Sequence, residues 1–164
     1  MGSGKTAVLA EASDILSLRK IVHAAVDLDA LGLAYLPRSV PNDQVLYENL
    51  RSTCKNYAAQ GVRRFLLARA VENEAQLRLC REIFPAQKTM VCRLIVDIQT
   101  MERRIENRES GILRREYIAR VKKLSDVLDR ARLEDFIVSN EDRHLTEVAT
   151  EVLVKAAWIR PTTA

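Results

Sequence analysis

The sequence predicts an α/β fold, a three-layer sandwich in which helices cover both faces of a parallel β-sheet. Segments with helical periodicity alternate with short, strongly apolar runs along the chain, which is the pattern of a parallel sheet with crossover helices. A partial phosphate-binding motif, GSGKT, stands directly before the first helical segment. Acidic residues follow the next apolar run, at the edge where open α/β sheets bind ligands.

The predicted elements are short and regularly spaced. Helices are expected at 5–18, 45–60, 73–84 and 116–132, with a last helix capped by Thr146. Strands are expected at 21–26, 62–68, 89–96 and 135–138. Arg93 lies inside one strand, so it must pair with an acid, lie near the end of the sheet or bind phosphate.

Length and composition fit one domain at 1–160 with a tail at 161–164. The 164 residues are 48% hydrophobic, enough to bury a core. No apolar run approaches the ~20 residues of a membrane span, and no secretory signal is recognised. The three cysteines are odd in number and lack C-x-x-C spacing, which indicates reduced thiols. We therefore expect a cytoplasmic protein without a membrane partner; the oligomeric state stays open.

The basic charge leaves two kinds of ligand open. A net charge of +4 can attract either nucleic acid or a small anionic substrate. Aromatic residues make up only 5% of the chain, so platforms for stacking bases are not evident. A basic RNA-binding module is therefore the least favoured function.

The GSGKT segment predicts a nucleotide site. It matches the second half of the phosphate-binding pattern G-x-x-x-x-G-K-[ST]. Glycine lets backbone N–H groups surround an anion, lysine adds charge at the outer phosphates, and threonine ligates Mg²⁺. We predict ATP and Mg²⁺ as cofactors of Gly2, Ser3, Gly4, Lys5 and Thr6. The alternative, a linker followed by an accidental Lys-Thr, explains the helical continuation less well.

Charged residues at strand ends are the other candidates. Asp27 and Asp29 could hold Mg²⁺, contact substrate or act as a general base; the alternative is a helix cap or a turn. Arg69 stands where a second acid is expected, after the strand at 62–68, and could bind an anionic substrate or be merely exposed. Arg38, in the loop at 32–43, could line the substrate pocket or lie on the surface.

The arginine-rich segment at 98–115 has two interpretations. Arg104 and Arg108 are four residues apart, on one helical face. A mobile helical hairpin could place both over a transferring phosphoryl group as a lid. The alternative is a solvated helix whose glutamates pair with the arginines.

The whole order of these features resembles small P-loop kinases, with adenylylsulfate, gluconate and shikimate kinases nearest in layout. The resemblance rests on GSGKT, Asp27-x-Asp29, the arginine-rich segment and the run DFIVSN at 135–140. It implies phosphoryl transfer to a hydroxylated or anionic metabolite. It also implies that Lys5, Asp27, Asp29, Arg104 and Arg108 are catalytic, and that Asn140 lies near the adenine.

Members of that group carry a complete loop and a central first strand, both lacking here. The resemblance therefore implies a slot in the sheet between the strands at 62–68 and 89–96, where backbone groups lose hydrogen-bond partners. We expect that the natural product starts upstream or that the chain is a truncated gene product, binding ATP weakly and melting at low temperature. The alternative function is nucleotide binding without turnover, as an inactive or regulatory protein.

Overall fold

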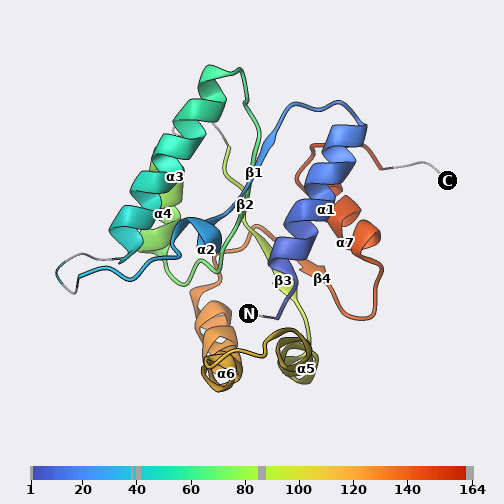
Figure 1. Ribbon diagram of the computed structural model, residues 1–164. Helices are drawn as coiled ribbons and strands as arrows, with labels where there is room; N and C mark the ends of the chain where they lie inside the picture. Colours follow the sequence, from blue (N-terminus) through green and yellow to red (C-terminus); the bar gives the residue numbers. More distant parts are fainter. Residues whose placement is uncertain (1, 38, 40–41, 85–87, 162–164) are drawn as a thin grey trace.

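The computed structural model describes residues 2–37, 39, 42–84 and 88–161. Helices and strands alternate along the chain (Figure 1). The helices are α1 (Lys5–Leu18), α2 (Leu28–Leu31), α3 (Asn42–Ala59), α4 (Glu74–Ile83), α5 (Ile98–Arg108), α6 (Arg114–Ala131) and α7 (Leu145–Lys155). The strands are β1 (Ala24–Asp27), β2 (Phe65–Ala68), β3 (Cys92–Ile95) and β4 (Phe136–Ser139).

The strands form two parallel pairs. β1 pairs with β2, from Ala24 opposite Phe65 to Asp27 opposite Ala68. β3 pairs with β4, from Cys92 opposite Phe136 to Ile95 opposite Ser139. Over the described part of the chain no ladder joins β2 to β3. The predicted parallel pairing is therefore observed, and the two pairs are separated at the place where the resemblance implies a slot.

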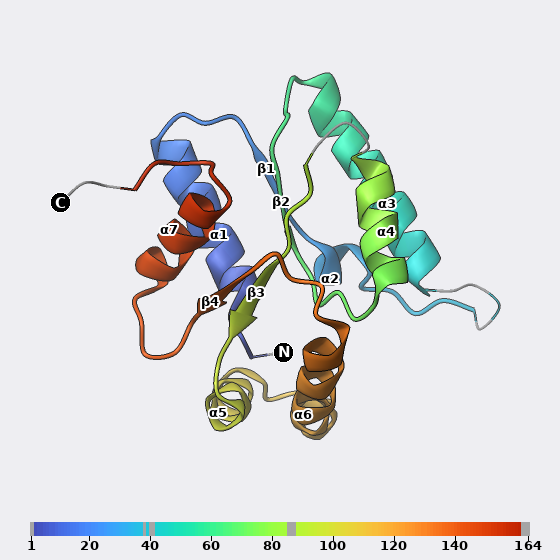
Figure 2. The same ribbon diagram turned by 180° about the vertical axis from the view of Figure 1, so that it is seen from behind.

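Helices cover both faces of the strands. The α1 and α7 helices pack together on one face, while α3 and α4 lie on the opposite face (Figures 1 and 2). The α5–α6 hairpin lies beyond the ends of β3 and β4 (Figure 1). This arrangement confirms a mixed α/β protein with parallel strand pairing.

Each helical face has its own apolar cluster. The cluster under α1 and α7 includes Leu16, Val148 and Leu153, all fully buried, and Trp158 packs against it. The cluster under α3 and α4 is centred on other buried side chains: Leu28, Leu50 and Cys54. The two clusters meet the strands from opposite sides, so the strand side chains are shared between them.

The ends of the elements differ from the predictions by a few residues. The last helix begins at Leu145, and Thr146 does not cap it; its hydroxyl donates to Glu11 across the α1–α7 contact at 2.6 Å. The α6 helix begins at Arg114, so the last two residues of the predicted lid belong to this long helix. Gly61 follows α3 with a positive φ of 87°, as expected of a glycine that ends a helix.

Leu16→Ala tests the α1–α7 contact. Leu16 is 0% exposed, so truncation should lower the free energy of unfolding by about 2–5 kcal/mol. The control is Leu18→Ala at a side chain that is 85% exposed, where the change should stay within about 0.5 kcal/mol. Urea denaturation measures both variants, and equal losses would contradict the described packing of α1.

Candidate phosphate-binding site

The loop at residues 2–6 is built around two glycines in the left-handed conformation. Gly2 has φ 73° and Gly4 has φ 87°. A Cβ on Gly2 would lie 2.7 Å from the Met101 carbonyl oxygen, and a Cβ on Gly4 would overlap the Asn140 side-chain amide. The loop therefore approaches α5 and the end of β4 so closely that side chains at these two positions would not fit.

The loop leads into a helix N-terminus with free amide groups. The first helical bond runs from Val8 N–H to the Gly4 carbonyl at 2.9 Å. Within the described residues, the N–H groups of Thr6 and Ala7 have no hydrogen-bond acceptor. The first turn of α1 carries no acidic residue. These amides and the positive end of the helix dipole can therefore receive an anion.

Lys5 contributes a partly desolvated positive charge beside two carboxylates. Burial lowers the pKa of Lys5, while the charges of Asp29 and Asp27 act in the opposite direction. The charge of Arg108 also lowers the pKa of Lys5, as the smallest of these effects. A phosphate placed here would offset the cost of burying the ammonium group.

Asp27 performs two tasks at once. One of its oxygens accepts a hydrogen bond from the Thr6 hydroxyl at 2.6 Å. The other accepts from the Asp29 N–H at 3.0 Å and caps α2. The structural alternative for Asp27, a helix cap, is therefore confirmed, and the same carboxylate also reaches the loop. Asp29 is exposed in the first turn of α2.

Two oxygen groups that could ligate Mg²⁺ are thus adjacent, the Thr6 hydroxyl and the Asp27 carboxylate. Hard oxygen donors of this kind fit Mg²⁺, which takes its remaining ligands from phosphate and water. No group of three or more histidine, cysteine, aspartate or glutamate side chains is arranged for a metal within the described residues. The site therefore fits an ion that arrives together with a phosphate better than one held by protein alone.

Asn140 supports the loop from behind. Its side-chain amide is buried and donates to the Ser3 carbonyl at 2.8 Å, and its own carbonyl accepts from Arg104 at 3.0 Å. Asn140 and Arg104 thereby connect β4, the loop and α5. Asn140 therefore has a structural task; its predicted place near adenine stays a prediction.

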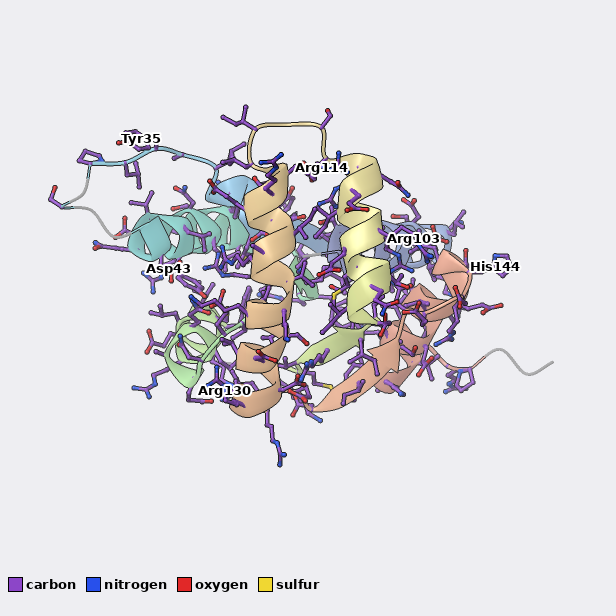
Figure 3. The ribbon with its side chains drawn as sticks, turned by 90° about the horizontal axis from the view of Figure 1, so that it is seen from below. Tyr35, Asp43, Arg103, Arg114, Arg130 and His144 are labelled. Atoms are coloured by element: carbon purple, nitrogen blue, oxygen red, sulfur yellow. The ribbon has the colours of Figure 1, made fainter. Side chains whose placement is uncertain are left out.

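The α5–α6 hairpin is attached at its base and exposed at its tip. Glu141 accepts from the Asp97 N–H at 2.8 Å and from the Thr100 hydroxyl at 2.7 Å, where α5 begins. Figure 3 looks onto this edge, where α5 and α6 lie side by side. Arg108 pairs with Glu109 at 2.8 Å. The alternative to a lid, in which glutamates pair with the arginines of this segment, is therefore observed for Arg108.

Arg69 is not an exposed strand-end arginine. Its side chain is only 15% exposed and pairs with Asp43 at 2.7 Å. Its guanidinium also lies 5.7 Å from the centre of the Tyr47 ring, and its Nε is buried without a hydrogen-bond partner in the described residues. With Lys5, it lines a cavity of about 270 Å³. Arg69 can therefore present positive charge to a ligand.

The sequence also singles out Arg93 and Arg38. Arg93 pairs with Asp129 at 2.7 Å and with Glu134 at 3.7 Å. The interpretation that a strand arginine meets acids is thus confirmed. Arg38 lies outside the described residues.

Sequence reasoning missed two acidic residues that organise this edge. Asp43 fixes Arg69, and Glu141 fixes the start of α5. Glu141 directly follows Asn140 after a strand, a position that could have marked it. Asp43 lies far from Arg69 in sequence, so no local signal connects the two.

Comparison of the chain with protein-family models, with curated proteins and with solved structures gives no match. None of the helices in the described ranges combines the length and apolar character needed to cross a membrane.

Substitutions of Asp27 separate its two tasks. Asparagine caps helices about as well as aspartate, so Asp27→Asn should change stability by less than about 0.5 kcal/mol. It loses the charge beside Thr6, so the Mg²⁺ dependence of ATP binding should weaken roughly tenfold. Asp27→Ala should lose about 1 kcal/mol of stability as well. Asp29→Asn is the control, in which the Mg²⁺ dependence of ATP binding should stay the same. Unchanged Mg²⁺ dependence in Asp27→Asn would contradict a metal-binding role for Asp27.

Proposed function

We propose that this protein binds ATP with Mg²⁺ at residues 2–6 and transfers the terminal phosphoryl group to a small hydroxylated or anionic metabolite. The observation that carries the proposal is the meeting of the loop, the N-terminus of α1 and the Asp27 carboxylate at one edge of the strands. Fixed N–H groups, a lysine and a hydroxyl–carboxylate pair are the elements that phosphoryl transfer requires.

Each residue then has a role that its contacts support. The amides of Thr6 and Ala7 receive phosphate oxygens, and Lys5 neutralises their charge. Thr6 and Asp27 would hold Mg²⁺, which would supply neutralisation of phosphate charge. Asp29 is exposed and orients or deprotonates the acceptor hydroxyl. Arg69 holds an anionic part of the acceptor, since its cavity also contains Lys5.

The α5–α6 hairpin completes the proposed site as a lid. Arg108, whose charge lowers the pKa of Lys5, has a side chain that is 64% exposed and pairs with its neighbour Glu109. Closure of the hairpin would exchange that exposed pairing, worth about 0–1 kcal/mol, for a phosphate contact. Arg104 moves less, because the Asn140 carbonyl holds its guanidinium.

A second candidate is nucleotide binding without turnover. Arg69 occupies the end of β2, where a metal-binding acid is expected, and an ion pair with Asp43 holds it there. Over the described part of the chain, β2 and β3 are also not joined, so the loop does not lie on a continuous sheet. Both features reduce the precision with which reacting groups are held, and catalysis is sensitive to such precision.

The deciding experiment measures the melting temperature against Mg-ATP concentration and then ATP consumption with a panel of hydroxylated and anionic metabolites. Binding to the folded state alone adds ~2.7 kcal/mol at a hundredfold excess over Kd. A rise in melting temperature with acceptor-dependent ADP formation supports the kinase. A rise without turnover supports the second candidate, and no rise even at high Mg-ATP contradicts both.

A further inference from the structure

The most exposed large apolar side chains of the described residues lie on two loops. Tyr35, Ile112 and Leu33 are 99%, 98% and 90% exposed. Ile112 lies in the turn between α5 and α6, while Leu33 and Tyr35 lie in the loop that follows α2. In Figure 3 this loop and the turn extend from the same side of the molecule. Single exposed apolar residues are ordinary, whereas several on one side indicate a surface that contacts a partner.

The turn between α5 and α6 holds its aliphatic residues away from the core. The Arg114 N–H donates to the Gly111 carbonyl at 3.2 Å, so Ile112 and Leu113 are the two central residues of a hydrogen-bonded turn. A Cβ on Gly111 would meet no atom within 4 Å. Leu113 is itself 42% exposed. The turn therefore presents an aliphatic tip that no other described part of the protein covers.

The net positive charge of the protein lies in the same hairpin. Residues 98–132 contain ten of the 26 arginines and lysines and six of the 22 acids, so this segment carries the net charge of +4 and the rest of the chain is balanced. Arg114 and Arg115 follow the aliphatic tip directly, and both are exposed. Among the described residues, the basic side chains of the hairpin that form ion pairs are Arg108 and Arg120. Arg114 and Arg115 are therefore available to an anionic surface.

An aliphatic tip beside two arginines fits an anionic lipid surface better than a nucleic acid. Aliphatic side chains are stabilised at the boundary between headgroups and acyl chains, and arginines are attracted by anionic headgroups. A nucleic acid would contact the arginines and leave Ile112 in water. Tyr117 is the one aromatic residue of the segment 98–132, and it is half-buried, so it offers no exposed platform for stacking bases. Tyr35 has the amphipathic ring that is enriched at membrane interfaces.

We propose that the tip of the α5–α6 hairpin, with Ile112 at its centre and Arg114 and Arg115 beside it, docks reversibly onto an anionic lipid surface. The loop of Tyr35 forms a second contact on the same side. The expectation of no membrane partner rests on the lack of a spanning segment, whereas peripheral docking needs only an apolar tip and basic neighbours. The proposal does not use nucleotide binding, since none of these side chains has a role in the proposed phosphate site.

Sedimentation with vesicles tests the docking. At about 50 mM salt the chain should sediment with phosphatidylcholine vesicles that contain about 30% phosphatidylserine, and it should stay in solution with phosphatidylcholine alone. Raising the salt to about 500 mM should release most of the protein, because salt screens the attraction to headgroups. The absence of sedimentation with the anionic vesicles at low salt would overturn the proposal.

Substitutions at the tip separate its apolar and charged parts. Ile112→Ser should weaken vesicle binding roughly tenfold through lost apolar burial. Arg114→Gln/Arg115→Gln should weaken it roughly 25-fold, at roughly fivefold for each basic residue near the surface. The matched controls are Leu18→Ser and Arg63→Gln/Arg64→Gln, which change exposed residues outside the hairpin and should bind as the parent chain does. Equal losses in the controls would overturn the proposal.

A tryptophan at the tip measures insertion directly. In Ile112→Trp the fluorescence should shift to the blue with anionic vesicles, and lipids with brominated acyl chains should quench it. The native Trp158 packs against the apolar cluster under α1 and α7, so the parent chain should show neither change. Sedimentation without quenching in Ile112→Trp would show attraction by charge alone and would overturn docking through the tip.

The dependence on distance from the tip separates a lipid surface from a nucleic acid. Lys122 lies two helical turns, about 10.5 Å, beyond Arg115, which is about one Debye length at 0.1 M salt. Lys122→Gln should therefore weaken vesicle binding clearly less than Arg115→Gln. Retention of duplex RNA that both changes weaken equally and Ile112→Ser leaves intact, without vesicle binding, would assign the hairpin to a nucleic acid and overturn the proposal.

Two further occupants of the tip give distinct results. If a second copy covers it, the chain should form dimers in the absence of lipid, and Ile112→Ser should dissociate them. If the two loops cover each other, hydroxyl-radical labelling of the free chain should leave Tyr35 and Ile112 unmodified. Either result would overturn docking onto a lipid surface.

Discussion

Gly4→Ala should lower the free energy of unfolding by about 3 kcal/mol and abolish the stabilisation by Mg-ATP. The position has φ 87°, where a Cβ costs about 1–2 kcal/mol in a left-handed backbone. The new Cβ would also overlap the Asn140 side-chain amide, and overpacking adds about 1–3 kcal/mol. Relief of the overlap would push the loop away from β4 and so displace the amides that we propose to receive phosphate. Urea denaturation and Mg-ATP titration measure the two effects.

Gly61→Ala is a matched control. Gly61 has the same φ of 87°, and a Cβ there would meet no atom within 4 Å. Gly61→Ala should therefore lower the free energy of unfolding by about 1–2 kcal/mol, through backbone strain alone, and leave Mg-ATP binding intact. The double variant Gly4→Ala/Asn140→Ala removes the overlap. Its loss of unfolding free energy should therefore be smaller than the sum of the two single-variant losses by at least about 1 kcal/mol. Equal effects of Gly4→Ala and Gly61→Ala would contradict the tight contact with Asn140.

Lys5→Met should separate stability from binding. Methionine keeps the aliphatic bulk and removes a charge whose pKa burial lowers, so stability should stay unchanged or rise. The same change removes a charge-assisted contact to phosphate, worth about 1.5–3 kcal/mol, or roughly 10–100-fold in Kd. The rise in melting temperature with Mg-ATP should therefore disappear.

The control for Lys5→Met is Lys55→Met, at an exposed position of α3. It should leave both the melting temperature and its response to Mg-ATP unchanged. A normal Mg-ATP response in Lys5→Met would show that the nucleotide does not use the α1 N-terminus. A large loss of stability in Lys5→Met would instead give Lys5 a structural role.

The sequence alone determined much of the order of elements, because its signals are local. The spacing of apolar residues predicted the long helices and the strands seen in the described residues, with ends displaced by a few residues because the observed strands are shorter. The prediction that Thr146 caps the last helix was wrong, because Thr146 lies inside α7 and its hydroxyl donates to Glu11. Capping propensity is local, whereas the contact with Glu11 exists only after α1 and α7 have packed.

Sequence reasoning also placed the candidate site at the loop and at Asp27, because strand ends in parallel α/β folds share one edge. It left open whether Asp27 caps a helix or serves the site, and the structure gives this residue both contacts. For Arg69 it left an exposed surface residue as an alternative, yet the side chain is mostly buried against Asp43 and Tyr47. Those partners come from α3, and no spacing rule connects α3 with the end of β2.

The sequence by itself determined which residues are candidates for phosphate binding, since glycine, lysine and threonine carry the chemistry that such a site needs. Only the tertiary structure decided that the Asn140 amide and Met101 press on the two glycines, and that Glu141 holds the start of α5. The structure also leaves β2 and β3 unpaired with each other over the described residues, at the place where the resemblance implies a slot. These features depend on distances between segments far apart in the chain, which are set by packing of the whole core rather than by neighbouring residues.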